Sequence, residues 1–347
     1  MLSRVLTVFS VLLLVASSHA QNSETDGLVK WLTLKEAQEK NKAFPKPFII
    51  DIYTDWCGWC KHMMRTTYSN PNLAAYINAN FYPVKFNAET KDTIEYNGKV
   101  YKPLSKDPKT PHELAVKFLG SGLSYPSTMF VTNNYEYNLL SQGYLEDKKI
   151  EPLLVFMTEN VWRNVQYGEF EKHFTNTFYD TAFAKAPVKI YSLSELEKAQ
   201  KKKPKKVLVN ITAPFCNTCK VMSKTTYLDT SMASYINKNF YLVDLDATAD
   251  TLVLNKEKYP KVMVNNFPLN SLALKLTANR FSFPSLSLLD EQLNVIDVLN
   301  FYQSPEHLRP ILAFIASNAY KDKTKTFNDF MQEYMKPKTA SAKTGKK

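Results

Sequence analysis

The sequence feature that most constrains the fold is an internal repeat, because residues 61–82 recur in residues 220–241. A single offset of 159 residues aligns the two segments, and it also places Cys57 on Cys216 and Cys60 on Cys219. The positions identical in both copies are Lys61, Met63, Thr66, Thr67, Tyr68, Ala74, Tyr76, Ile77, Asn78, Asn80, Phe81 and Tyr82. A repeat of this length includes several secondary-structure elements, so we expect two domains of the same fold.

Length and composition agree with two domains of ordinary size. The chain has 347 residues, and 44% of them are hydrophobic, which is enough for two buried cores. We expect the first domain over residues 27–165 and the second over residues 186–322, with the boundary near residues 184–188. A helical appendix follows each domain, over residues 166–185 with the linker and over residues 323–347 with a Lys-rich tail.

Aromatic residues at steps of three or four mark each appendix as an amphipathic helix. The two apolar stripes consist of Phe170, Phe174 and Phe178, and of Phe327, Phe330 and Tyr334. We expect both stripes to pack against the parent domain or across the domain junction, and a groove for a binding partner is the alternative.

The segment FIIDIYTDWCGWCKHMM, residues 48–64, changes from a strand pattern to a helix pattern at its cysteines. Both thiols therefore fall in the first turn of a helix, with Asp55 expected to cap it. The unpaired N–H groups and the macrodipole at a helix N-terminus stabilise a thiolate at Cys57. Cys60 lies one turn deeper and should be more shielded, so Cys57 is the expected attacking sulfur and Cys60 the resolving one.

Both copies predict the same order of elements. Each begins with a capping-box helix at residues 33–36 or 192–195. The further elements expected are strands at 48–53, 82–86, 207–211 and 241–245, helices near 73–77, 112–119, 150–162, 232–236 and 307–320, and a hairpin after Pro126 and after Pro284. This order predicts an α/β fold in which a mixed central sheet is flanked by helices.

Residues 1–20 have the layout of a secretory signal peptide, with Arg4, an apolar run over residues 5–16, and Ser18-His19-Ala20. The apolar run is too short to span a bilayer. We expect cleavage after Ala20 and an exported protein, periplasmic or secreted; an uncleaved anchor is the alternative.

The net charge of +11 is concentrated in the run Lys201 to Lys206 and in the C-terminal tail. Solvated surface explains both, and attraction to an anionic envelope surface or an acidic partner is the alternative. The sequence contains no groove-reading motif, so nucleic acid is not an expected partner.

All four cysteines belong to the pairs Cys57/Cys60 and Cys216/Cys219. In an oxidising compartment this usage favours disulfide exchange, since structural disulfides usually bridge distant segments. A four-cysteine zinc site is the competing interpretation. The separation of the pairs and the aromatic residues beside them disfavour it, so we expect neither a metal nor a cofactor.

The motif DIYTDWCGWCK resembles the thioredoxin superfamily, through the acid six residues before the first Cys, the preceding Trp and the following Lys. Its DWCxxCK form is similar to the exported thioredoxin-like domains of periplasmic disulfide reductases. The resemblance implies two tandem thioredoxin-like folds. The dipeptide Gly58-Trp59 matches neither Gly-Pro nor Pro-His, so the direction of electron flow does not follow from the motif.

Asp51 interrupts an apolar strand, where burial should raise its pKa. Such a base near Cys60 would accept that thiol's proton as a mixed disulfide resolves. The acid at the matching position of thioredoxins has this role, and the resemblance implies that Lys85 is its paired lysine. An outward-facing Asp51 on an edge strand is the alternative.

The resemblance also implies that Pro126 is the cis-proline that faces the cysteines and leaves the preceding backbone free to pair with substrate. Trp56, Trp59 and Tyr125 are the expected substrate contacts. Pro284 is the corresponding residue of the second copy.

The second copy departs from the first around its cysteines. Asn210 replaces Asp51, Asp244 replaces Lys85, Phe215 replaces Trp56, and Asn217-Thr218 fills the motif. Without an acid at Asn210, proton transfer to or from Cys219 should be slower, so we expect a weaker or differently poised redox centre.

The leading hypothesis is an exported thiol-disulfide oxidoreductase that exchanges electrons with disulfide-containing protein substrates, in the reductase or isomerase direction. Its electron donor would be a membrane-embedded thiol reductase. The alternatives are a substrate-binding or chaperone module with an inert second pair, and a metal carrier that adds His62, Met63 and Met64 as ligands.

Overall fold

The computed structural model describes residues 27–180, 188–264, 266–280 and 282–336. The predicted signal peptide, most of the predicted domain boundary and the end of the Lys-rich tail lie outside these residues. In the part of the chain that is described, no helix combines the length and the hydropathy needed to cross a bilayer.

The first domain is built on a four-stranded sheet with the order β2-β1-β5-β6. Strand β1 (Phe48–Tyr53) pairs in parallel with β2 (Tyr82–Asn87) and antiparallel with β5 (Ser127–Val131), which continues the hairpin into β6 (Asn138–Gln142). The helices are α1 (Leu34–Ala43), α2 (Gly58–Arg65), α3 (Pro71–Asn80), α4 (Glu113–Leu119) and α5 (Asp147–Thr158). A small hairpin of β3 (Ile94–Tyr96) and β4 (Lys99–Tyr101) is added to the expected elements.

The second domain repeats this sheet with the order β13-β12-β7-β8. Its strands are β7 (Lys206–Thr212), β8 (Phe240–Asp246), β12 (Ser285–Leu289) and β13 (Val295–Asn300), and its helices are α7 (Leu193–Lys202), α8 (Asn217–Lys224), α9 (Thr230–Asn239), α10 (Ser271–Leu276) and α11 (Pro305–Ala316). The mixed sheet flanked by helices that the sequence predicts is therefore present in both copies.

A second sheet in this domain was not expected. Strands β9 (Thr251–Leu254), β10 (Glu257–Val264) and β11 (Phe267–Asn270) form a three-stranded antiparallel sheet between β8 and α10. Most side chains of β10 are exposed, so the segment lacks the regular apolar alternation that identifies a half-buried strand.

The helix starts follow from local sequence. Thr33 and Ser192 cap α1 and α7, and each completes a capping box with a glutamate three residues later. The closing helices end earlier than expected, at Thr158 and Ala316, and each is followed by a short 3₁₀ turn after an asparagine in the left-handed region.

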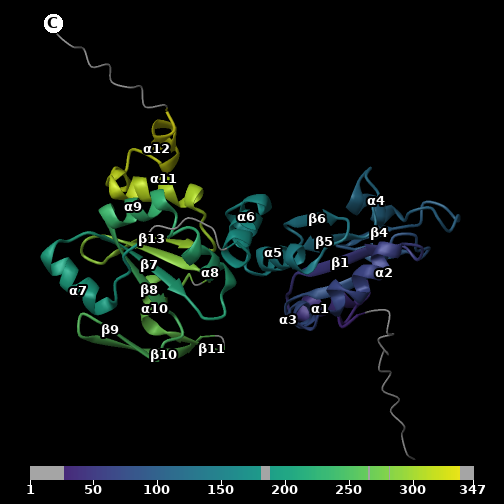
Figure 1. The fold of residues 1–347 in the computed structure, drawn as a ribbon, viewed down its shortest axis with the longest axis horizontal. Helices are drawn as coiled ribbons and strands as arrows, with labels where there is room; N and C mark the ends of the chain where they lie inside the picture. Colours follow the sequence, from purple (N-terminus) through teal and green to yellow (C-terminus); the bar gives the residue numbers. More distant parts are fainter. Residues whose placement is uncertain (1–26, 181–187, 265, 281, 337–347) are drawn as a thin grey trace, which may run out of the picture.

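Helix α6 (Tyr167–Phe178) joins the two domains, lying with α5 between the two main sheets (Figure 1). Its Phe170 is fully buried, with its ring 5.4 Å from that of Tyr302, and His173 Nδ1 lies 2.7 Å from the Tyr302 hydroxyl. The side chain of Asn164 donates hydrogen bonds to the carbonyls of Asn300 and Tyr302. The first appendix therefore packs across the domain junction, one of the two placements expected.

Helix α12 (Phe327–Tyr334) forms the second appendix and packs on its own domain. The rings of Phe327 and Phe330 lie 5.3 and 5.2 Å from that of Phe314 in α11.

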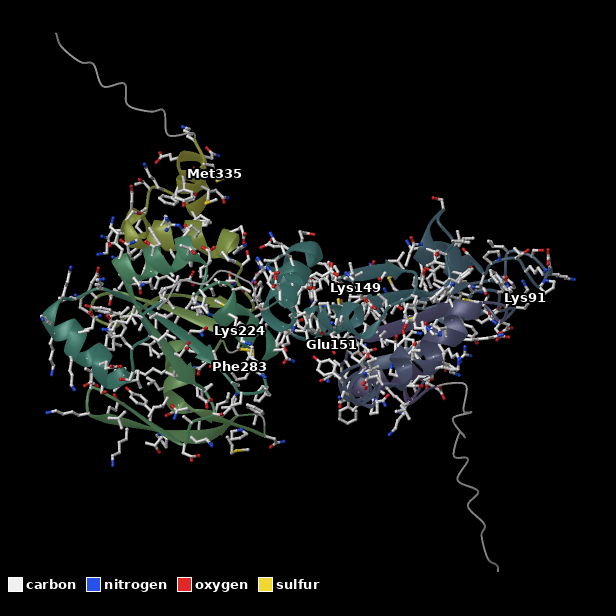
Figure 2. All side chains as sticks on the ribbon, viewed as in Figure 1. Lys91, Lys149, Glu151, Lys224, Phe283 and Met335 are labelled. Atoms are coloured by element: carbon white, nitrogen blue, oxygen red, sulfur yellow. A yellow bond between two sulfur atoms is a disulfide. The ribbon has the colours of Figure 1, made fainter. Side chains whose placement is uncertain are left out.

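Figure 2 shows Lys149 and Glu151 of α5 near the domain junction, and Lys91 at the far end of the first domain.

Candidate functional site

The first cysteine pair lies at the N-terminus of α2 and forms a disulfide. Cys57 is the N-cap residue, and its Sγ accepts a hydrogen bond of 3.0 Å from the backbone N–H of Cys60. The expectation that Asp55 caps this helix is wrong, because the Asp55 carboxylate instead accepts a hydrogen bond from the Asn87 side chain. The sulfur of Cys57 thus takes the capping position itself, where the helix favours negative charge.

The two sulfur-bearing residues are buried to the same degree. Cys57 is 4% exposed and Cys60 is 3% exposed, so the expected difference in shielding is absent from the disulfide form. Their neighbours differ sharply from them, since Trp56 and Trp59 are 63% and 62% exposed. Two exposed indole side chains therefore flank a buried disulfide.

Asp51 is fully buried in the central strand β1, opposite Lys85 of β2 and Thr128 of β5. This placement excludes the alternative of an outward-facing residue on an edge strand. Burial raises the pKa of Asp51 to about 7, although the positive charge of Lys85 lowers it in part. The expected raised pKa is confirmed, and the carboxyl group changes charge within the range in which thiols exchange.

Lys85 shares the register position opposite Asp51, and its ammonium group lies 5.2 Å from the centre of the Tyr53 ring. Tyr68 reaches toward the same region from the segment after α2, and burial together with the negative charge of Asp51 raises its pKa. The structure therefore brings Asp51, Lys85 and a tyrosine that sequence reasoning did not single out into one electrostatic group.

Four aromatic residues border the first pair, and we call Trp56, Trp59, Tyr125 and Tyr144 the aromatic rim. The rings of Trp56 and Tyr125 are 6.0 Å apart, and those of Trp59 and Tyr144 are 5.7 Å apart. Trp56 Nε1 donates to the Glu89 carboxylate, which fixes the indole. The peptide bond between Tyr125 and Pro126 is cis, as the resemblance implied.

The second pair repeats this local geometry at the N-terminus of α8. Cys216 and Cys219 form a disulfide, and Cys216 Sγ accepts a hydrogen bond of 3.0 Å from the N–H of Cys219. The bond between Phe283 and Pro284 is also cis. Because each pair closes on itself, the cysteines do not converge in a four-sulfur site.

The polar groups behind the second pair are rearranged, with Asn210 fully buried on β7 and Asp244 exposed at the neighbouring position of β8. The amide of Asn210 donates to Asp244 Oδ1 at 2.6 Å and accepts from the Tyr227 hydroxyl at 3.1 Å. Desolvation by the surrounding protein raises the pKa of Asp244, although the side chain has an exposed surface and the hydrogen bond from Asn210 lowers the pKa in part. Asp244 and Cys219 line one cavity of about 330 Å³, so the acid missing at Asn210 reappears on the neighbouring strand.

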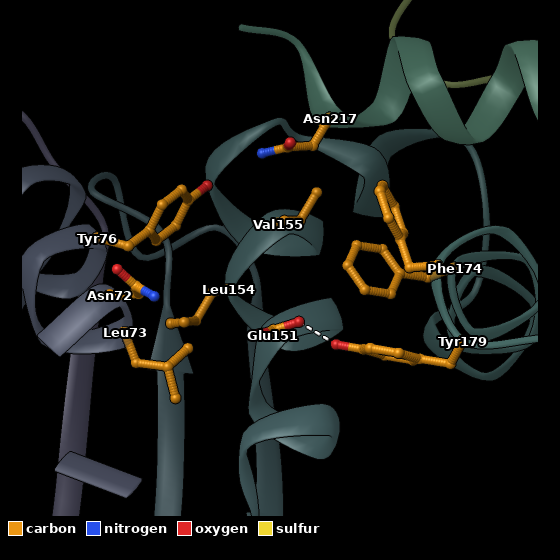
Figure 3. A pocket seen from close by; sticks show the side chains of 10 residues that line it. Asn72, Leu73, Tyr76, Glu151, Leu154, Val155, Phe174, Tyr179 and Asn217 are labelled. Atoms are coloured by element: carbon orange, nitrogen blue, oxygen red, sulfur yellow. Dashed lines mark hydrogen bonds between the residues drawn. The ribbon is translucent and has the colours of Figure 1, made fainter. Parts of the chain in front are cut away.

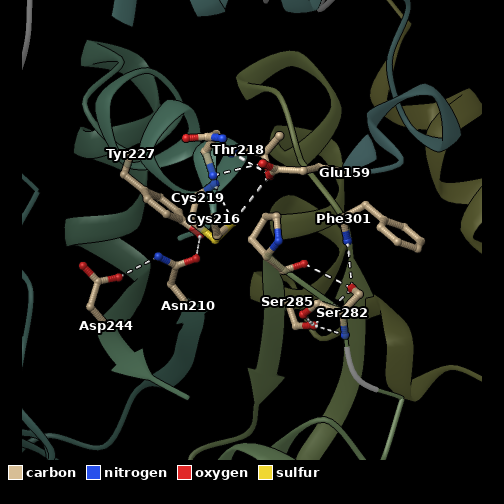
Figure 4. Close-up of a disulfide and its surroundings, with 12 residues drawn as sticks. Glu159, Asn210, Cys216, Thr218, Cys219, Tyr227, Asp244, Ser282, Ser285 and Phe301 are labelled. Atoms are coloured by element: carbon tan, nitrogen blue, oxygen red, sulfur yellow. Dashed lines mark hydrogen bonds between the residues drawn. A yellow bond between two sulfur atoms is a disulfide. The ribbon is translucent and has the colours of Figure 1, made fainter. Parts of the chain in front are cut away.

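Glu159, the residue that ends α5 of the first domain, reaches the second cysteine motif (Figure 4). Its carboxylate accepts hydrogen bonds from the N–H groups of Asn217 and Thr218, at 3.1 and 2.8 Å, and from the Thr218 hydroxyl. Its Oε2 is 3.7 Å from Cys216 Sγ. No sequence signal marked Glu159, because its role depends on how the two domains pack.

A cavity of about 370 Å³ lies at the same junction (Figure 3). Side chains of α3, α5 and α6 line it, among them Tyr76 and Phe174, and Asn217 of the second domain closes one side. The Tyr179 hydroxyl donates to the Glu151 carboxylate across it. Among the described residues, no group of three or more His, Cys, Asp or Glu side chains is placed to hold a metal ion.

Two family models match the chain in succession. Thioredox_DsbH, described as "Protein of unknown function, DUF255", matches residues 12–156, and Thioredoxin_2, described as "Thioredoxin-like domain", matches residues 193–316. With the repeated sheet and the CxxC pairs at helix starts, these matches define tandem domains of the thioredoxin superfamily. The first domain is of the DsbH/DUF255 type and the second is a Thioredoxin_2 domain. Their CxxC centres suggest thiol-disulfide oxidoreductase activity.

Similar solved structures include a thioredoxin-fold protein from Helicobacter pylori, which is 17% identical over 46% of this chain and 88% of its own, with a TM-score of 0.28. DsbH oxidoreductase is 16% identical over 38% of this chain and 86% of its own, with a TM-score of 0.27. Full-length ERdj5 is 10% identical over 86% of this chain and 33% of its own, with a TM-score of 0.26. These scores lie below 0.5, so the family matches define the class.

Proposed function

We propose that the protein is an exported thiol-disulfide oxidoreductase that reduces or isomerises disulfides in protein substrates through Cys57 and Cys60. The observation that carries the proposal is the first centre itself: a cysteine pair at a helix N-terminus, an aromatic rim beside it in which Trp56 and Trp59 are exposed, and a buried acid on the strand that leads into it. In each cycle, Cys57 attacks the substrate disulfide, and Cys60 then releases the reduced substrate from the mixed disulfide.

Asp51 supports the reducing direction. Release requires Cys60 to lose its proton before it attacks, and a carboxylate whose pKa is about 7 accepts that proton near neutral pH. The aromatic rim and the backbone before Pro126 would hold the substrate chain, and every substrate reduced leaves Cys57 and Cys60 oxidised. Continued turnover outside the cytosol therefore needs an electron donor, for which we propose a membrane-embedded thiol reductase.

The test is reduction of insulin disulfides with dithiothreitol as the electron source. Cys57→Ser should abolish the catalysed reaction, whereas Cys216→Ser should leave most of it, because Glu159 covers the second motif. Unchanged activity in both variants would refute the enzyme proposal.

A second candidate function is substrate binding without redox turnover. It is favoured for the second domain alone, because Glu159 covers the cysteine motif of that domain. In this case the variant Cys57→Ser/Cys60→Ser should still suppress aggregation of a reduced, unfolded substrate. If this variant lost both the suppression of aggregation and the reduction of insulin, binding and chemistry would be assigned to the same centre.

A further inference from the structure

We propose that Glu159 of the first domain controls the reactivity of Cys216 in the second domain. In the reduced protein Glu159 keeps Cys216 as a protonated thiol, and in the oxidised protein it makes the Cys216–Cys219 disulfide resistant to reduction. The inference does not depend on the proposed function of Cys57 and Cys60, because it requires only that the disulfide between Cys216 and Cys219 can be reduced. It assigns a positioning residue that lies outside both CxxC motifs and in the other domain.

The first step of the argument is the use of the helix N-terminus. The N–H groups of Asn217 and Thr218 begin α8, and in a free helix they would be available to stabilise a thiolate at the N-cap Cys216. Here both donate to the Glu159 carboxylate instead, and the Thr218 hydroxyl donates to it as well. Two of the first N–H groups of the helix are thus already used by another anion, while the N–H of Cys219 still donates to Cys216 Sγ.

The second step is the charge itself. With Oε2 3.7 Å from Cys216 Sγ, an ionised Glu159 and a thiolate at Cys216 would be two like charges in contact. One of them must hold a proton, and the thiol of a reduced Cys216 is placed to donate it toward Oε2. Burial raises the pKa of Glu159 and the hydrogen bonds from Thr218 and Asn217 lower it in part.

Among the described residues, the hydrogen-bond partners of Glu159 carry no positive charge. The charge of Glu159 also acts on Tyr76 of α3, whose pKa rises to about 12 mainly through burial and partly through that charge. Tyr76 is therefore neutral at physiological pH.

The first domain provides the internal comparison. Its motif dipeptide, Gly58-Trp59, is exposed to solvent, whereas Thr218 is fully buried beneath Glu159. The C-cap of α5 is Glu159, and the C-cap of the equivalent α11 is Ser317, which carries no charge. The two centres thus share a backbone geometry, and the second has in addition a carboxylate from the other domain at the start of its helix.

The chemical consequence concerns both halves of the reduction. A reductant thiolate attacks Cys216 Sγ, breaks the bond to Cys219 and forms a mixed disulfide, while Cys219 leaves as a thiolate. The second thiol of the dithiol reductant then attacks the reductant sulfur of the mixed disulfide. This closes a disulfide within the reductant and releases Cys216. Two electrons pass from the dithiol to the cysteines, and its two protons end on their thiols. The negative charge of Glu159 opposes both the reductant thiolate that attacks Cys216 and the Cys219 thiolate that leaves.

The experiment reads Cys216 directly, in a Cys57→Ser/Cys60→Ser background that excludes the first centre. The reduced protein is alkylated with iodoacetamide between pH 6 and pH 10, and Cys216 modification is followed by peptide mass spectrometry. Glu159→Gln keeps the side-chain shape and an acceptor oxygen but removes the charge. It should move the midpoint of alkylation down by about one pH unit, which raises the rate near pH 7 about tenfold. The exchange equilibrium with dithiothreitol should move toward the reduced form of Cys216 and Cys219.

Glu151→Gln is the matched control, since it removes a carboxylate from the same helix at the same junction but away from Cys216. Its midpoint should equal that of the background protein. Glu159→Ala is the second charge-removing variant and should shift the midpoint in the same direction as Glu159→Gln. An unchanged midpoint in the folded Glu159 variants, or an equal shift in Glu151→Gln, would overturn the inference. Either result would leave the role of Cys57 untouched.

Discussion

Replacing Asp51 with asparagine should make the first domain more stable than that of the natural protein at alkaline pH. In acid, the replacement should change how stability depends on pH only a little. The pKa of Asp51 rises from 3.8 in an unstructured peptide to about 7 in the folded protein, because the carboxylate is desolvated. Since each tenfold change is worth about 1.4 kcal/mol, ionising Asp51 in the native state costs about 4 kcal/mol relative to the unfolded chain.

The sign follows from proton binding. Between pH 4 and pH 7 the native state holds the Asp51 proton and the unfolded state does not, so this group makes stability fall as pH rises through that window. The asparagine side chain of the variant does not titrate, so the stability of Asp51→Asn minus that of the natural protein should grow by about 4 kcal/mol from pH 4 to pH 8. Asn210 shows that the fold accommodates asparagine at the equivalent position, where it hydrogen-bonds to Tyr227.

The assay is urea unfolding followed by tryptophan fluorescence, which reports on the first domain and its junction because the four tryptophans are Trp31, Trp56, Trp59 and Trp162. Asp55→Asn, at an exposed position after the same strand, controls for the loss of a surface carboxylate. Parallel pH profiles for Asp51→Asn and the natural protein would refute the assignment of Asp51 as a buried, titrating acid.

Three further predictions concern the rim, the junction and the resolving thiol. Trp59→Ala should raise the KM for protein disulfides about fivefold or more and change the free energy of unfolding by less than about 0.5 kcal/mol, because the ring is exposed; steady-state kinetics with Phe215→Ala as the comparison checks this. Phe170→Ala should lower the free energy of unfolding by about 3–5 kcal/mol, since it empties a fully buried site at the junction; denaturant titration with the exposed Phe178→Ala as control measures it, and equal losses in the two would contradict it. Cys60→Ser should accumulate mixed disulfides with protein substrates on non-reducing gels, and Cys219→Ser should accumulate far fewer; equal trapping by both would contradict the division of roles.

Local sequence was sufficient for the elements that surround each cysteine pair. The capping boxes at Thr33 and Ser192, the apolar strand around Asp51 and the turn prolines all act over a few residues, so their patterns were readable without the rest of the chain. The internal repeat then allowed each copy to support the assignment of the other. The roles assigned to Asp51, Lys85 and Pro126 in disulfide exchange stay predictions.

The features that sequence did not reveal depend on distant contacts or on exposed strands. Glu159 matters because the end of α5 meets the start of α8, and no spacing rule relates positions in two separate domains. The sheet of β9, β10 and β11 has mostly exposed side chains, so hydrophobic periodicity carried little signal there. Asp55 was assigned to the cap because it is a good capping residue, but the sulfur of Cys57 occupies that position.

The most direct test of the account is the rate at which iodoacetamide alkylates Cys57 in the reduced protein at pH 6, compared with free cysteine. The account predicts faster alkylation of Cys57, because the N–H groups and the dipole at the start of α2 stabilise its thiolate. Alkylation no faster than that of free cysteine would contradict the central claim that this sulfur is the nucleophile of the enzyme.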